Sequence, residues 1–375
     1  LLSGTGNWVI KLDSMGANAA NFDTNVDYLL PVATFSGLSG FDTNQFTIDT
    51  SAFSNAVDGV WGVETNGTNL YVTYRANSLV LDPSFEWDAP SNGFWSVGMN
   101  WIGRTAPSPI NPGTLLRFGG LPSDPAYTAS NNLGTFLLNN LVFTNNHRIV
   151  TNVLAGDTLE FRNSGASIEL WGGGSFIVSN GVTLTTNLTF GGVGTGTVVM
   201  ASNIVGGMSF TKQGAWTLAL KGSNSFASPL LFTNAGVIRM DTNYALGTSS
   251  FTVTNGGTLF GTVPLVIGNG TALRTARVTG SGSVWTNSGV LTIASNTTIT
   301  VDNGGWLIAN GITMNAIGSD VENGLVISNG GQVLCTTSAT FIGTSYTGAN
   351  NRVSVIGGPG VVSRWDLGGQ TLAIG

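Results

Sequence analysis

The side chains that most often do chemistry in proteins are scarce in this chain. Its 375 residues include one histidine, His147, and one cysteine, Cys335. A serine nucleophile needs a histidine as its general base, so any catalytic triad would have to be built on His147. A zinc site draws its ligands mainly from several His and Cys residues, which this chain does not supply. We therefore predict no catalytic residue, no cofactor and no metal site, a structural or solvent-exposed His147, and a buried Cys335 thiol.

Two closely spaced carboxylate pairs offer a second kind of chemistry. They are Glu86-x-Asp88 and Asp320-x-Glu322. Glycoside hydrolysis uses two carboxylates at a defined separation, and residues two apart on a strand point to the same side. Trp87 lies within the first pair and could stack on a sugar. The acids do not recur in register along the chain, so we interpret them as solvated turn acids and keep a polysaccharide-degrading β-helix enzyme as a third hypothesis.

A short oxygen-rich motif, Asp-Thr-Asn, occurs at 23–25, 42–44 and 241–243. Calcium takes about six to eight oxygen ligands. An Asp side chain at such a position also bonds the backbone two residues on and makes a self-capped turn. Since no EF-hand loop is present, we interpret all three motifs as turns.

The tryptophans are the remaining candidates for binding. Trp285 and Trp365 occupy matching positions of an internal repeat, which favours packing in a core. Trp87, Trp95 and Trp101 are clustered in the sequence. Exposed aromatic rings can stack on sugars, so we keep these three as candidate glycan-binding residues.

The composition excludes several protein classes. Charged residues make up 9% of the chain and hydrophobic residues 42%, whereas ordinary globular proteins contain about 25% charged residues. Enough apolar matter is present to exclude intrinsic disorder, and the chain lacks the Ala, Glu, Lys and Leu content of helical bundles. A net charge of −6 with 13 basic residues argues against nucleic-acid binding, because few positive charges are available to neutralise phosphates. No apolar run approaches about 18 residues, so we predict no membrane insertion.

Strand-turn-strand units repeat along the chain. Three share the turn Asn-Gly-Gly, at 255–257, 303–305 and 329–331, between runs rich in Val, Ile, Leu and Thr. Such short repeats cannot fold alone and must stack on their neighbours. We therefore predict an all-β fold, a parallel β-helix or β-solenoid. Its low charge has a structural cause, because like charges would otherwise recur about every 4.8 Å along the stack.

The period-two pattern around these turns predicts the core. The predicted inward residues are Val253, Leu259, Ile299, Val301, Leu307, Leu325, Ile327 and Val333. We also predict that Gly256, Gly304 and Gly330 lie at equivalent corners, at least some of them with positive φ.

The first part of the chain differs from the rest. Residues 1–76 are more acidic, and Asn66-Gly67 between alternating runs predicts a β-hairpin near their end. We predict a β-rich amino-terminal segment over 1–76 and a solenoid over 77–375. Within the solenoid, 77–120 is a Trp- and Pro-rich first segment and 121–375 holds the stacked repeats. The start at Leu1 without a methionine predicts a processed chain or a segment of a longer one.

Residues 206–226, GGMSFTKQGAWTLALKGSNSF, resemble the bacterial autotransporter-associated β-strand repeat. That motif runs Gly-Gly, Thr-Lys, Gly, a Thr-Leu-x-Leu strand, then Gly-x-Asn and an aromatic residue; Trp216 stands where the family usually has Thr. Residues 280–285 and the Asn-Gly-Gly units resemble a related surface-protein repeat, and residues 1–75 resemble the closing segment of such a unit. The resemblance implies a secreted or surface-displayed bacterial solenoid protein and carries no catalytic residues.

These observations lead to one main hypothesis, a non-enzymatic extracellular structural protein. Residues 369–375 have the pattern of a strand in mid-repeat without a polar cap. We expect the edge near Leu372 and Ile374 to pair with the first 75 residues of a like unit, giving a head-to-tail polymer. The alternative is that flanking repeats of a longer chain make the same contact. A carbohydrate-binding surface adhesin is the second function that we consider.

Overall fold

A computed structural model gives the fold. The residues it describes are 8–16, 18–19, 21–22, 28–35, 45–55, 57, 60–65, 68–75, 83–119, 125–144, 150–226, 229–268, 273–294, 296–315, 322–343 and 350–375. The chain divides into two compact units, Leu1–Pro83 and Ser84–Gly375. The expected boundary between residues 76 and 77 lies outside the described residues.

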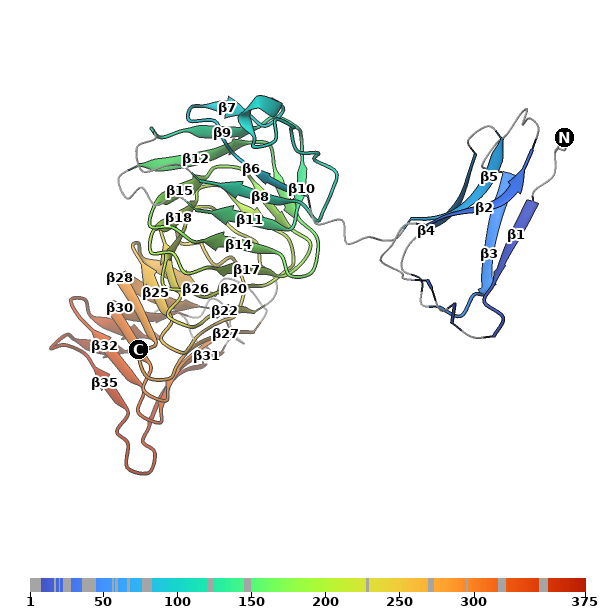
Figure 1. Cartoon of the computed structure of the whole chain (residues 1–375). Coiled ribbons are helices and arrows are strands. Elements are labelled where there is room, and N and C mark those ends of the chain that lie inside the picture. Colours follow the sequence, from blue (N-terminus) through green and yellow to red (C-terminus); the bar gives the residue numbers. More distant parts are fainter. Residues whose placement is uncertain are drawn as a thin grey trace. The chain divides into compact units, whose positions relative to one another are not determined.

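The first unit contains two small sheets (Figure 1). β1 (Trp8–Asp13) pairs in parallel with β3 (Phe46–Ala52). β2 (Tyr28–Thr34), β5 (Asn69–Arg75) and β4 (Val60–Thr65) form an antiparallel sheet in that order. β4 and β5 pair from Val60↔Arg75 to Thr65↔Leu70, which is the hairpin pairing expected around residues 66 and 67. An aromatic cluster packs this unit, with Trp61 and Tyr74 ring centroids 4.8 Å apart.

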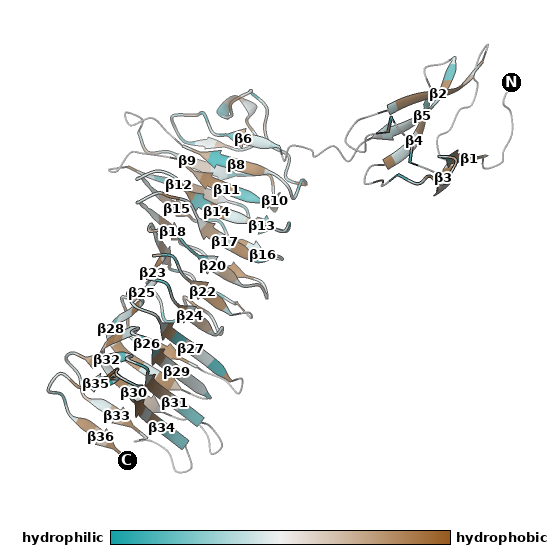
Figure 2. Cartoon of the chain, turned by 60° about the horizontal axis from the view of Figure 1, so that its bottom comes forward, coloured by the Kyte–Doolittle hydropathy of each residue, from teal (hydrophilic) through white to brown (hydrophobic). Residues whose placement is uncertain are grey.

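The second unit is a β-solenoid, as predicted. Its strands lie in three parallel sheets, here called sheets I, II and III, and successive coils stack rung upon rung (Figure 2). Sheet I contains, in order, β6 (Ser84–Glu86), β8 (Leu115–Phe118), β11 (Asn140–Phe143), β14 (Ser167–Leu170), β17 (Leu188–Gly191), β20 (Phe210–Lys212), β22 (Leu230–Phe232), β24 (Phe251–Val253), β27 (Arg274–Thr279), β29 (Thr297–Asp302), β31 (Glu322–Ser328) and β34 (Asn350–Ile356).

Sheet II follows sheet I around each coil. Its main path contains β7 (Gly93–Phe94), β9 (Thr128–Asn131), β12 (Thr151–Gly156), β15 (Ser175–Val178), β18 (Thr197–Met200), β21 (Thr217–Leu220), β23 (Val237–Met240), β25 (Thr258–Gly261), β28 (Val284–Ala294), β30 (Trp306–Asn315), β32 (Gln332–Cys335) and β35 (Arg364–Asp366). β26 (Leu265–Ile267) pairs with β28, β33 (Thr340–Ile342) with β30, and β36 (Leu372–Ile374) with β33. Sheet III contains β10 (Phe136–Leu138), β13 (Leu159–Phe161), β16 (Val182–Leu184) and β19 (Ile204–Val205).

Helical structure is almost absent from the part of the chain that the structure describes. The described residues include the short 3-10 helix η2 (Gly98–Asn100). No helix among the described residues is long and apolar enough to cross a membrane.

Inward side chains form continuous rows along the solenoid, because the parallel register brings like positions together. One row of sheet I runs through every coil: Phe85, Leu116, Leu141, Ile168, Phe190, Lys212, Phe232, Val253, Val278, Val301, Ile327 and Val355. The eight residues predicted for the core are all buried, with exposed fractions of 0 or 1%. The predicted core is therefore confirmed. Trp285 and Trp365 likewise share one row of sheet II, together with Leu307 and Val333.

The Asn-Gly-Gly corners link sheet I to sheet II. Asn255 and Gly256 have φ of 48° and 76°, Asn303 and Gly304 51° and 81°, and Asn329 and Gly330 46° and 82°. Each corner thus has two successive residues in the left-handed region, which Asn and Gly adopt most readily, so the predicted glycine corners are confirmed.

The second glycine of each corner is required for a different reason. A Cβ on Gly257 would lie 2.5 Å from the carbonyl oxygen of Phe232, and one on Gly305 2.5 Å from that of Val278. In both cases the oxygen belongs to a strand of the preceding coil in sheet I. A side chain at this position would therefore push two coils apart.

Candidate functional site

The carboxylates expected as possible acid and base groups do not form a catalytic pair in the described structure. Glu86 ends β6, and Asp88 lies two residues later with Trp87 buried between them. Asp88 is held in an ion pair with Arg104, with an Oδ2–Nη1 distance of 3.0 Å. Asp320 and His147 lie outside the described residues.

The described members of the Asp-Thr-Asn motif use their oxygens within the solenoid. Asp241 accepts two hydrogen bonds of 2.9 Å from the Arg239 guanidinium. The Asn243 side-chain oxygen accepts the Val266 backbone N–H at 2.6 Å. The copies at 23–25 and 42–44 lie outside the described residues. Within the described residues no group of three or more His, Cys, Asp or Glu side chains could hold a metal ion. Cys335 is buried as a free thiol.

The three candidate glycan-binding tryptophans lie in the interior. Trp87 is 5% exposed, and Trp95 and Trp101 are 0% exposed. Trp101 packs edge-on against both other indoles, at centroid distances of 5.2 Å and 5.9 Å. A sugar cannot stack on a ring whose faces are already covered, so the expectation that these residues bind glycans is wrong for this arrangement.

The segment 87–113, which carries these three tryptophans, instead forms a cap over the first coil of the solenoid. Residues 100–102 of the cap run antiparallel to residues 86–88, at and just after the end of β6. Asp88 N–H donates to the Asn100 carbonyl and Ile102 N–H to the Glu86 carbonyl, both at 2.8 Å. Leu137 N–H in β10 donates to the Pro109 carbonyl at 2.8 Å. Solenoids need such a cover because a bare end exposes unpaired backbone groups and core side chains. The Trp- and Pro-rich composition of this segment thus serves burial at the first end of the stack.

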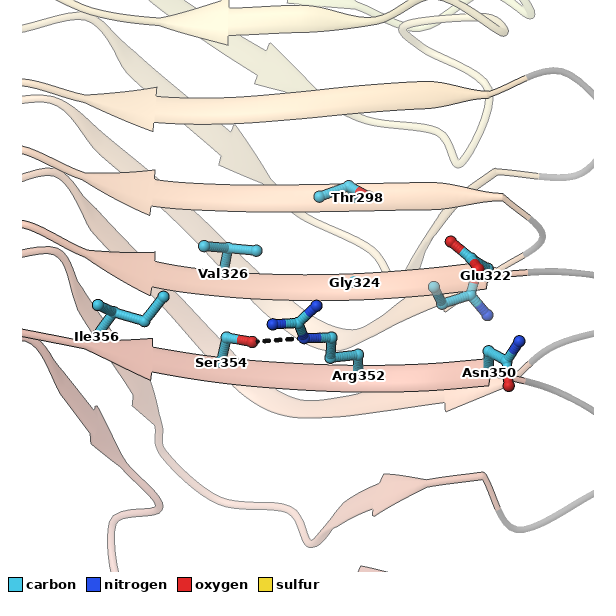
Figure 3. A pocket seen from close by; sticks show the side chains of 9 residues that line it. Thr298, Glu322, Gly324, Val326, Asn350, Arg352, Ser354 and Ile356 are labelled. Atoms are coloured by element: carbon cyan, nitrogen blue, oxygen red, sulfur yellow. Dashed lines mark hydrogen bonds between the residues drawn. The ribbon is translucent and has the colours of Figure 1, made fainter.

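A groove of about 340 Å³, with both polar and apolar lining, lies on the outer face of sheet I, near its last strands (Figure 3). Gly324 of β31 sits in the same outward row as Thr298 of β29 and Arg352 of β34, and its missing side chain leaves the groove open. The Arg352 Nε donates to the Ser354 Oγ at 2.9 Å. The described lining residues are Thr298, Glu322, Asn323, Gly324, Val326, Asn350, Arg352, Ser354 and Ile356. They include a single carboxylate, so the groove can hydrogen-bond a polar ligand but offers no acid–base pair.

Lys212 is a buried ionisable residue for which the sequence analysis predicted no role. It occupies the inward row of sheet I between Phe190 and Phe232 and is 0% exposed. Its Nζ donates to the carbonyls of Gln213 at 2.9 Å and Gly214 at 2.7 Å. The sequence contained a sign of this burial, because Lys212 follows Phe210 at the two-residue spacing of inward strand positions.

Burial lowers the pKa of Lys212 from its ordinary value to about 7. The two carbonyl oxygens and the Trp216 ring, 3.9 Å away, stabilise the charged form and hold the side chain in place. An amine with such a pKa is a nucleophile at neutral pH. Solvent does not reach this one, so it acts as a corner clamp within the core.

The last coil leaves its strands with one free edge each. β34 pairs with β31, β35 with β32 and β36 with β33. No other described residue pairs with these strands as part of a sheet. The side chains expected at an assembly edge are exposed here, Leu372 to 38% and Ile374 to 73%.

Comparisons of the chain with models of protein families, with curated proteins and with solved structures found no match.

Proposed function

We propose that the protein is a non-enzymatic structural β-solenoid that works outside the cell, where it assembles head-to-tail into a surface filament or sheath. The observation that carries this proposal is the inward row of sheet I, which continues from Phe85 to Val355 without a break. Each coil is held by parallel backbone pairing and by side chains that stack on the same side chain position of the next coil. Such a stack resists bending and offers few loops to proteases.

The composition supports the same role. The low share of charged residues lets identical positions stack without repulsion. The extracellular location rests on the resemblance of residues 206–226 to a repeat of surface proteins.

Head-to-tail assembly would extend the coil-on-coil pairing that already joins the described strands of sheets I and II. Exposed strand edges attract further strands. A contact between unlike ends does not close on itself and so propagates into a filament.

Sedimentation velocity over a wide concentration range, with electron microscopy of the same samples, tests the proposal. We expect the sedimentation coefficient to rise with concentration and unbranched rods to appear. A monomer that persists at the highest soluble concentration would contradict head-to-tail assembly. Protease resistance of the intact chain, followed by mass spectrometry, tests the structural role separately: rapid cleavage within 150–226 would contradict it.

A second candidate function, glycan binding, is favoured by Trp171. Its indole is 53% exposed, and its Nε1 donates to the Glu169 Oε2 at 2.7 Å. Ser167 Oγ donates to Glu169 Oε1 at 3.0 Å, and Asn140 Nδ2 donates to Ser167 Oγ at 2.9 Å. The ring is therefore held in one orientation on the outside of the solenoid, beside polar groups that could bind hydroxyls.

A glycan array with the wild-type chain and a Trp171→Ala variant tests this second function. We expect a bound glycan class to lose most of its signal in the variant. An array on which the wild type binds nothing, or on which both proteins bind alike, would contradict it.

A further inference from the structure

The interior of sheet I contains polar positions as well as apolar ones. β27 alternates buried and exposed residues, so Arg274 faces inward together with Ala276 and Val278. Arg274 is 9% exposed, and its partner in the next coil, Thr297, is 0% exposed. Burial lowers the pKa of the Arg274 guanidinium from its ordinary value, because an interior stabilises a positive charge less well than water does. A negative charge beside this guanidinium would therefore be bound favourably.

A small cavity of about 10 Å³ lies beside Arg274, between two successive coils. Residues 240–251 of one coil and residues 265–274 of the next contribute to its wall. The described polar side chains of the wall are Asn243, Ser249 and Arg274, and its other described residues are apolar or glycine. This volume suffices for one particle about the size of a water molecule. A polyatomic ion such as sulfate or phosphate is too large for it.

The Ser249 hydroxyl group has no hydrogen-bond partner in the described part of the chain, although Ser249 is only 7% exposed. Ser249 lies two residues before Phe251, as Arg274 lies two residues before Ala276, and Phe251 pairs with Ala276. Ser249 and Arg274 are therefore neighbours in one inward row. Buried polar groups in folded proteins nearly always bond to a protein group or to a bound particle. The Ser249 hydroxyl thus favours a ligand in the cavity.

The three polar side chains of the wall can all donate hydrogen bonds. Arg274 carries N–H donors and a positive charge, and Ser249 carries an O–H. The Asn243 Oδ1 accepts the Val266 N–H at 2.6 Å, which leaves the amide N–H groups of Asn243 as donors. No described residue of the wall is acidic. Such a wall favours an anion over a water molecule, because an anion accepts the same hydrogen bonds and also compensates the charge.

We propose that this cavity binds one monatomic anion of the size of chloride, held by the Arg274 guanidinium and the Ser249 hydroxyl, with the Asn243 amide as a third donor. Asn243 and Ser249 belong to one coil and Arg274 to the next, so the bound anion joins two coils and stabilises the folded chain. The site lies within the solenoid and does not depend on the proposed assembly.

Thermal unfolding in sodium chloride and in sodium gluconate at equal ionic strength tests the site in solution. Gluconate is too large for the cavity, and both salts screen charges alike. The general effect of each salt cancels when a variant is compared with the wild type in the same salt. Ser249→Ala removes one donor, Arg274→Met removes the charge, and Lys221→Met removes an exposed charge as the control.

We expect the stabilisation by chloride to level off as the site fills. The chloride concentration needed for half of this effect should rise at least about tenfold in Ser249→Ala and change less than about twofold in Lys221→Met. In gluconate, Ser249→Ala should be at least as stable as the wild type, because it removes a buried hydroxyl that has no partner. Arg274→Met should lose the specific response to chloride, and if it does not fold, Ser249→Ala decides alone.

An equal response to chloride in the wild type and Ser249→Ala would overturn the proposal, because the cavity would then contribute nothing. Crystals grown in sodium chloride provide a second measurement at a long X-ray wavelength, where chlorine scatters anomalously. We expect an anomalous difference peak in contact with Arg274 and Ser249. Density without an anomalous signal would show that water occupies the cavity, and a peak without a response in solution would show binding at crystal concentration only; either result would contradict the anion site.

Discussion

The ammonium group of Lys212 lies 3.9 Å from the centroid of the Trp216 ring, within an inward row whose other members are all apolar. The contact crosses the corner between β20 and β21, and the Trp216 Nε1 donates in turn to the Gly191 carbonyl of the preceding coil at 2.6 Å. One buried cation and one indole thus tie a corner to the coil before it.

The first prediction concerns the pH dependence that this buried amine imposes. The pKa of Lys212 is lowered to about 7 in the folded chain, whereas it is about 10.4 in an unfolded chain. Between these values the unfolded chain binds more protons, so the free energy of unfolding should rise from pH 7 to about pH 10, by up to about 5 kcal/mol. Below pH 7 both states are protonated and this contribution is lost.

Melting temperatures at pH 6 and pH 9.5 measure the effect in Lys212→Met, with the exposed Lys221 replaced by Met as the control. We expect Lys212→Met to be stabilised relative to the wild type at pH 6 and much less so at pH 9.5. A pH profile identical in Lys212→Met and Lys221→Met would contradict the prediction.

The second prediction compares neighbouring glycines of one corner. Gly304 has φ of 81° and room for a Cβ, so Gly304→Ala should cost only the left-handed strain, about 1 to 2 kcal/mol. A Cβ on Gly305 would lie 2.5 Å from the Val278 carbonyl oxygen, so Gly305→Ala should cost about 3 kcal/mol or more. Urea unfolding followed by circular dichroism compares the two, and a larger loss for Gly304→Ala would overturn the proposed roles.

The third prediction concerns the tryptophan cap. Trp101 is fully buried, and its Nε1 donates to the Trp95 carbonyl at 3.0 Å. Trp101→Ala should remove about 3 to 5 kcal/mol of stability and expose the first coil to protease. Trp171→Ala, which removes an exposed indole, is the matched control and should change stability by less than about 1 kcal/mol. Equal stability of the two variants would show that the cap does not protect the stack.

The fourth prediction concerns the hydrogen bonds of a buried asparagine. The Asn180 Nδ2 donates to the carbonyls of Ala155 at 2.8 Å and Asp157 at 2.7 Å, both in the coil before it. Asn180→Asp keeps the shape but removes both donors and sets a carboxylate against two carbonyls, so it should cost more than Asn180→Ala. We expect Asn180→Ala to lose about 1 to 3 kcal/mol, measured by urea unfolding at pH 7. An Asp variant as stable as wild type would contradict this role.

The repeat pattern was sufficient to predict the solenoid, its core and its corners. Val253 and Val301 alternate with outward residues at a period of two, and Gly256 and Gly304 follow an Asn at the end of such runs. Both features are local, since strand alternation and left-handed turns depend on residues that are close in sequence. Even the place of Lys212 in the inward row follows from its spacing after Phe210.

The tertiary structure decided everything that depends on contacts between coils or at the ends of the stack. The need for glycine at 305 comes from the Val278 carbonyl of another coil, which no local pattern reveals. Trp87, Trp95 and Trp101 had the spacing of a binding cluster, but their segment folds back over β6 and buries them. Composition and spacing determine what each strand can do, whereas burial and edge exposure depend on which distant strands lie beside it.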